Sequence, residues 1–154
     1  MASSEVRFES TVVIDAPIED VFDRLADLSS YARWMHHDGL FRRCTLTSDP
    51  PVRLGTTYAD ATRMGTFDGE VVEYVRPTRL AFRETLRWFG RPVSEARTEY
   101  TLEADGGSTV VRHVAVGELF TWMRAMKPGA AWMADRERPR TLRSLGRSLE
   151  GRAR

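Results

Sequence analysis

Apolar and polar residues alternate at the start of the chain. Val6, Phe8, Val12 and Ile14 fall on one face of an extended chain, whereas charged and polar residues occupy most of the other face. A period of two is typical of a strand that buries one face. Residues 5–15 are therefore predicted to form such a strand.

Two short helices are predicted after this strand. Pro17, followed by Glu19 and Asp20, favours a helix start, because proline suits the first turn and carboxylates interact favourably with the positive end of the helix dipole. Apolar residues then recur at helical spacing as far as Leu28. A second short helix or turn is predicted between residues 29 and 34.

The middle of the chain returns to strand patterns that are divided by turn residues. The separators are rich in Gly, Pro and Asp, and such short connections favour an antiparallel meander. The predicted strands are residues 40–47, 55–63, 67–76, 79–88, 93–104 and 108–117.

The last third predicts a long helix from Ala130 onward, after an interruption at Pro128-Gly129. Pro139 has no N–H to donate inside a helix, so we expect a kink or a break there. A twisted sheet with one amphipathic helix across its concave side is predicted to enclose volume. Three apolar positions follow the i, i+3, i+7 spacing of one helix face: Leu142, Leu145 and Leu149.

Composition limits the classes of protein. The chain has 154 residues, of which 42% are hydrophobic and 29% charged, and this fits one globular domain over residues 1–154. A formal net charge of +1 does not favour a nucleic-acid partner. The single cysteine, Cys44, excludes an intramolecular disulfide and favours a reducing compartment. Without a signal-peptide pattern or an apolar run of roughly 20 residues, we expect a cytoplasmic protein with no membrane insertion.

The opening motif resembles a known superfamily. The run 12–22, followed by Leu25-Ala26-Asp27 and Tyr31-Ala32-Arg33-Trp34, is similar to the START/pollen-allergen-like superfamily, also called SRPBCC. It is most similar to the polyketide cyclase/dehydrase-like branch. The strand that begins at Gly69 and the closing helix also match, so the resemblance covers nearly the whole chain.

The resemblance implies an α+β helix-grip fold. In this fold a curved antiparallel sheet of six to seven strands wraps on a long C-terminal helix, and two short helices follow the first strand. Members bind lipids, sterols, polyketides or hormones in the cavity between sheet and helix, and some catalyse cyclisation or dehydration there. The interruptions at Pro128-Gly129 and Pro139 depart from the family's more continuous closing helix.

Glu84 is the first candidate for catalysis. It shares one face of the predicted strand 79–88 with apolar residues. A carboxylate on an apolar face is costly unless it is paired or hydrated. Inside a cavity its pKa would rise, which suits a general acid or base. A register slip, a bulge or pairing with an inward arginine would instead make Glu84 structural.

His113 is the second candidate for catalysis. Two phases compete in the strand 108–117: one turns Thr109 and His113 inward, and the other turns Val110 and Val114 inward. Alternation alone favours the second phase because it is more apolar, whereas the resemblance favours the first. An inward His113 would relay protons near neutral pH, or it would be a satisfied structural histidine.

Aromatic residues are candidates for contact with a ligand. Rigid rings supply large contact areas, and a buried tyrosine hydroxyl needs a polar partner. Trp34 is either part of such a wall or a core residue between helix and sheet. The predicted ligand-binding residues are Trp34, Tyr58, Phe67, Phe82, Trp88, Tyr100 and Trp122.

Neither a metal nor a cofactor is expected. His36 and His37 are adjacent and have no cysteine pair or further histidine nearby, which does not suit a zinc site. The sequence has no phosphate-binding loop, nucleophile elbow or dinucleotide fingerprint.

Three functions remain open. The first is binding of a small hydrophobic molecule, polyketide- or lipid-like, in a cavity with a few polar anchors. The second is a polyketide aromatase/cyclase or dehydratase, in which Glu84 or His113 moves protons and a tyrosine polarises a carbonyl. The third is a partner-binding module with a filled core, in which Trp122 and Trp132 occupy the interior. A homodimer is compatible with each of these functions.

Overall fold

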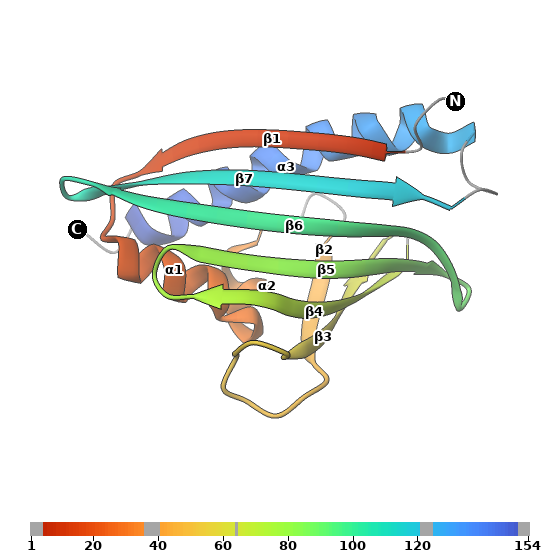
Figure 1. Cartoon of the computed structure of the whole chain (residues 1–154), viewed down its shortest axis with the longest axis horizontal. Coiled ribbons are helices and arrows are strands. Elements are labelled where there is room, and N and C mark those ends of the chain that lie inside the picture. Colours follow the sequence, from red (N-terminus) through yellow and green to blue (C-terminus); the bar gives the residue numbers. More distant parts are fainter. Residues whose placement is uncertain (1–4, 36–40, 64, 121–124, 151–154) are drawn as a thin grey trace.

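A seven-stranded sheet and a long helix dominate the computed structural model, which describes residues 5–35, 41–63, 65–120 and 125–150 (Figure 1). The strands are β1 (Glu5–Ile14), β2 (Phe41–Leu46), β3 (Thr57–Thr62), β4 (Thr66–Val75), β5 (Arg79–Trp88), β6 (Arg91–Asp105) and β7 (Ser108–Leu119). The helices are α1 (Ile18–Ala26), the 3-10 helix η1 (Leu28–Ser30), α2 (Tyr31–Trp34) and α3 (Lys127–Glu150).

The sheet is antiparallel throughout. β2 to β7 follow one another as a meander, and β1 pairs with β7 at the far edge, so the order is β1-β7-β6-β5-β4-β3-β2. An extra residue interrupts the register at Val72 of β4 and another at Val93 of β6, opposite Leu86 and Arg87 of β5. Such bulges bend a strand and increase its twist. The predicted helix-grip fold is confirmed, because the curved sheet packs against the long C-terminal helix.

The main apolar core lies under α1, α2 and the C-terminal third of α3. Phe22 and Leu25 of α1 are fully buried there against Leu80 and Val111 of the sheet. A smaller apolar cluster lies near the start of α3 and consists of Val93, Leu119, Leu86, Trp88 and Ala130. The buried residues of α3 lie in its last nine positions: Leu142, Ser144, Leu145, Gly146 and Leu149.

The structure corrects the prediction for the closing segment. α3 is one helix from Lys127, so the expected interruption at Pro128-Gly129 and a break at Pro139 are wrong, whereas the alternative of a kink at Pro139 stays a prediction. Pro128 lies in the first turn, where a backbone N–H has no partner within the helix. Pro139 removes one donor from the helix interior, a cost of about 3 kcal/mol. Packing of the apolar face beyond it outweighs that cost.

Arginine–carboxylate pairs cover the outer, convex face of the sheet. Arg83 pairs with Glu70 at 2.9 Å, and Arg87 pairs with Asp68 at 2.7 Å, each between the neighbouring strands β5 and β4. These side chains are largely exposed, so each pair contributes at most about 1 kcal/mol. The charges of these four side chains on the outer face are therefore balanced within the pairs.

The main core gives a prediction about stability. Leu145 is fully buried, and Leu145→Ala is expected to lower the free energy of unfolding by about 2–5 kcal/mol through lost burial and a new cavity. Leu54 is 63% exposed, so Leu54→Ala should change it by no more than about 0.5 kcal/mol. Urea unfolding measures both, and equal losses in the two variants would contradict this account of the core.

Candidate functional site

Polar side chains gather on the concave face of the sheet, among its buried apolar residues. Side chains two positions apart in a strand share a face, and antiparallel pairing brings such residues of neighbouring strands together. We call the set the concave polar row: Cys44, Tyr58, Asp60, Glu84, Thr98, Tyr100 and His113.

A hydrogen bond between Tyr58 and Glu84 crosses the row from β3 to β5. The Tyr58 Oη donates to Glu84 Oε1 at 2.7 Å. Tyr58 is on β3 and Glu84 on β5, and Gly69 of the intervening strand β4 lies opposite both. A Cβ at Gly69 would come within 2.2 Å of the Tyr58 ring, so glycine is needed for the ring to cross β4.

This hydrogen bond gives the buried face a carboxylate with a donor. Burial, followed by the charge of Glu84, raises the pKa of Tyr58 well above its usual value, so the phenol stays protonated and keeps donating. The predicted inward direction of Glu84 agrees with this contact. Its partner is a tyrosine hydroxyl rather than an inward arginine.

Asp60 is a member of the row that sequence reasoning missed. It lies two residues from Tyr58 on the same strand and opposite Cys44 of β2. Among the described residues, its buried Oδ1 has no hydrogen-bond partner. Burial, and then the charge of Glu84, raise the pKa of Asp60 to about 7, while a hydrogen bond from Cys44 acts in the opposite direction. The signal that would have found it is its position two residues after Tyr58, which places both side chains on the same face of a strand.

Cys44 and Tyr31 lie at the α2 side of the row. Burial raises the pKa of the Cys44 thiol above its usual range, so it remains a thiol and is a poor nucleophile. The buried Tyr31 hydroxyl donates to the Leu25 carbonyl oxygen at 2.6 Å. Neither side chain therefore offers a charged group to a ligand at neutral pH.

His113 lies at the other end of the row and is completely buried. Its ring stacks on Tyr100, with centroids 4.5 Å apart and planes at 7°, and meets the edge of Phe8. Burial, and then the charge of Arg138, lower the pKa of His113 to about 2. The ring is neutral at physiological pH, which does not suit the predicted proton relay. The buried face of β7 carries Thr109, Val111, His113 and Ala115.

Arg138 of α3 extends to this end of the row. Its Nη1 donates to Thr98 Oγ1 at 3.3 Å and lies 3.5 Å from His113 Nε2. The helix therefore places a guanidinium over strands β6 and β7. Sequence reasoning missed this residue too, because nothing local to Arg138 distinguishes it from the other arginines of the chain.

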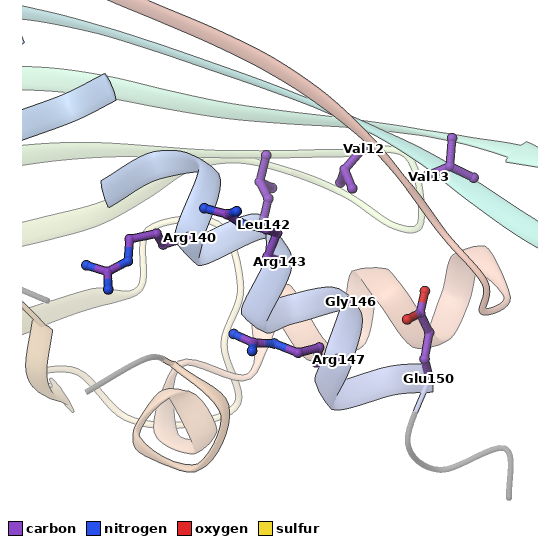
Figure 2. Close-up of a pocket in the computed structure, with 8 residues that line it drawn as sticks. All are labelled: Val12, Val13, Arg140, Leu142, Arg143, Gly146, Arg147 and Glu150. Carbon is purple, nitrogen blue, oxygen red and sulfur yellow. The ribbon is translucent and has the colours of Figure 1, made fainter. Parts of the chain in front are cut away.

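A separate groove lies between β1 and α3, outside the concave polar row (Figure 2). It has a volume of about 550 Å³. Val12 and Val13 line it from β1, and Arg143, Arg147 and other residues line it from α3. None of the predicted site residues lines this groove, so it does not bring them together.

A model of the protein family described as polyketide cyclase / dehydrase and lipid transport matches residues 5–150. The chain belongs to this family. The predicted recognition is therefore confirmed for nearly the whole sequence. A comparison with curated proteins finds no match.

Solved structures similar to this family member share its fold. Protein CV1439 from Chromobacterium violaceum is 19% identical with a TM-score of 0.68, covering 94% of this chain and 96% of that one. A START superfamily protein from Mycobacterium smegmatis is 13% identical with a TM-score of 0.72, covering 94% and 97%. The di-domain ARO/CYC BexL from the BE-7585A biosynthetic pathway is 18% identical with a TM-score of 0.70. The match covers 95% of this chain and 49% of BexL, so this chain spans about half of BexL.

Some of the aromatic residues predicted to contact a ligand lie in or beside the concave polar row, and the others lie elsewhere in the protein. Phe82 meets both Tyr58 and Tyr100 edge-on, with centroids 5.7 and 6.3 Å apart, and half-buried Phe67 lies opposite Asp60. These four rings surround the polar groups with apolar surface.

Trp34 and Trp88 lie elsewhere. Trp34 is in the main core in T-shaped contact with Tyr31, at 4.9 Å between centroids, and Trp88 is half-buried in the smaller apolar cluster. Trp132, the other tryptophan of the filled-core interpretation, is 57% exposed and contacts Arg136. Trp122, His36 and His37 lie outside the described residues. Within the described ranges, no helix is long and apolar enough to cross a bilayer.

Asp60 gives a prediction about pH. Its raised pKa means that the folded protein keeps a proton which the unfolded chain releases between about pH 4 and pH 7. Wild-type stability should therefore fall through that window relative to Asp60→Asn, by about 3–5 kcal/mol. Urea unfolding of both proteins across the window measures the difference.

The difference in stability between the wild type and Asp60→Asn removes the contributions of other titrating groups that the two proteins share. His113 contributes in the opposite direction, because its pKa is lowered on folding, but this contribution is common to both proteins and cancels. A stability difference that does not change with pH would contradict the account of Asp60.

Proposed function

We propose that this protein binds a small, mostly apolar molecule between the concave face of the sheet and the N-terminal half of α3. Two atoms of the row carry this proposal: Asp60 Oδ1 and His113 Nδ1 are buried and have no hydrogen-bond partner among the described residues. A buried polar atom without a partner costs about 1–3 kcal/mol. Hydroxyl and carbonyl groups on an apolar ligand would satisfy such atoms.

Small residues on the same face support a space for this ligand. Ala96 of β6 lies opposite Glu84 on one side and Gly117 on the other. Along β6, Ala96 lies between Val93, which packs against Ala130 of α3, and Thr98, which contacts Arg138. Among the α3 side chains that the structure describes, those before Leu142 are half-buried or exposed, so they pack less closely on the sheet than the end of the helix does.

The family supports an apolar, polyketide- or lipid-like ligand. Its description names polyketide cyclase, dehydrase and lipid transport, and the similar protein BexL comes from a biosynthetic pathway as a di-domain ARO/CYC. Phe67, Phe82 and the rings of Tyr58 and Tyr100 supply apolar contact surface around the polar groups.

The neutral fluorophore N-phenyl-1-naphthylamine tests the proposal. The wild type should bind it with increased fluorescence, and Ala96→Trp should weaken binding at least about tenfold by filling the space beside Glu84. Thr101→Trp places the same ring on the exposed face of the same strand and should leave binding within about twofold. Full affinity in Ala96→Trp, with its fold intact by thermal unfolding, would place the ligand elsewhere.

A second function, polyketide aromatase/cyclase or dehydratase, is favoured by the pKa of Asp60. A carboxyl with a pKa of about 7 exchanges its proton at neutral pH, and it lies near the Tyr58–Glu84 hydrogen bond. With Glu84 or Asp60 as the base, this site suits removal of a proton from the carbon next to a carbonyl of the substrate. His113 has a pKa of about 2, so its ring stays neutral over this range and neither gains nor loses a proton in this role.

Deuterium exchange distinguishes catalysis from binding alone. If Asp60 and Glu84 act as general acid and base, the wild type should speed the incorporation of deuterium at the carbon next to the carbonyl of 1-tetralone, an apolar ketone, in D₂O. Glu84→Gln should lower that rate by about 10²-fold or more, yet keep fluorophore affinity within about twofold. The absence of any acceleration by the wild type would favour a binding protein.

A further inference from the structure

Arg138 differs from the convex-face arginines in its partners. Arg83 and Arg87 each pair with a carboxylate on the neighbouring strand. The contacts of Arg138 within the described residues are instead neutral: Thr98 Oγ1 and His113 Nε2. Both of these partners are buried, so the half-buried guanidinium lies against a poorly hydrated surface with no anion among the residues that the structure describes. A charge in this setting is costly until it is paired.

Most of the donors of Arg138 remain for another partner. A guanidinium has five N–H donors in a planar fork. Thr98 and His113 both contact Nη1, and neither contacts Nη2 or Nε. The planar fork matches the two oxygens of a carboxylate, and such bidentate pairs are among the strongest hydrogen-bonded contacts in proteins.

His113 adds an unpaired donor to the same end of the row. Arg138 can only donate, so the contact between them makes His113 Nε2 the acceptor and places the ring proton on Nδ1. That buried Nδ1 has no hydrogen-bond partner among the described residues. This end of the row therefore combines a cation and an unpaired N–H and contains no described acidic partner for either.

The other end of the row has the opposite charge. Asp60 and Glu84 lie there, on β3 and β5, with Tyr100 within electrostatic reach of both ends. Burial raises the pKa of Tyr100 to about 12, Glu84 adds to that rise, and Arg138 acts against it. An anionic group is repelled by the carboxylate end and attracted by the guanidinium end.

We propose that the ligand is an apolar carboxylic acid whose carboxylate binds Arg138 and whose far end presents a hydroxyl or keto oxygen to Tyr58 and Glu84. This inference rests on the proposed ligand-binding function. It adds the chemical class of the ligand and its direction in the site. The direction follows because only the Arg138 end of the row is cationic. The apolar body of the acid would then lie along the row from β6 to β3.

Displacement of N-phenyl-1-naphthylamine tests the carboxylate. Decanoate and decan-1-ol have equal chains and differ in charge, so their ratio isolates the acidic group. At neutral pH the wild type should prefer decanoate about tenfold. In Arg138→Gln, decanoate should weaken about tenfold and decan-1-ol by less than twofold, whereas Arg138→Lys, which keeps the charge, should retain most of the preference.

Arg143→Gln is the matched control. Arg143 is an exposed arginine of the same helix that lines the separate groove of Figure 2, and this variant should leave both competitors unchanged. A loss of decanoate binding in Arg143→Gln would assign the acid to that groove and overturn the inference. Equal weakening of both competitors in folded Arg138→Gln would also overturn it.

The possible outcomes distinguish a failure of the carboxylate inference from a failure of the proposed ligand-binding function. Failure of the wild type to bind the fluorophore or either competitor would contradict the proposed function itself. Binding of the fluorophore without a preference for decanoate would leave the proposed function standing and overturn only the carboxylate. Because this preference is measured on the wild type, the inference stays falsifiable even when Arg138→Gln does not fold.

Discussion

Polar groups on the inner face of this sheet are largely removed from water, and the hydrogen bond from Tyr58 to Glu84 spans three strands of that face. It gives the half-buried carboxylate of Glu84 a donor at 2.7 Å, and it requires Gly69 in the strand between them. Burial, and then the charge of Glu84, raise the pKa of Asp60 to about 7. The contact between Tyr58 and Glu84 thus fixes the position of the charge that acts on Asp60.

The two faces of the sheet treat charge differently. On the convex face, Arg83 and Arg87 pair with carboxylates of the neighbouring strand in contact with water, where such pairs add little stability. On the concave face the carboxylates lie at one end and the guanidinium of Arg138 at the other, where His113 stacks on Tyr100. This separation gives the face a direction that a uniformly apolar cavity would lack.

Much of the architecture follows from the sequence by itself. The period of two in β1, the turn residues between strands and the spacing of Leu142, Leu145 and Leu149 depend on local geometry, so they predicted the sheet and the closing helix. Glu84 was found because a carboxylate on an apolar strand face is conspicuous. The helix continues through Pro139 without a break, because a local rule about helix interiors takes no account of packing further along α3.

The pattern along the chain therefore determined which segments are strands or helices and which faces are apolar. Only the tertiary structure decided which polar residues meet. Asp60 is an ordinary strand residue until antiparallel register sets it beside Cys44 and near Glu84, and Arg138 resembles every other arginine until α3 crosses β6 and β7. The same holds for Trp34, which packs in the core, and for the inward phase of His113. Burial, charge and hydrogen bonding at these positions are set by residues distant in the chain, which a local pattern does not contain.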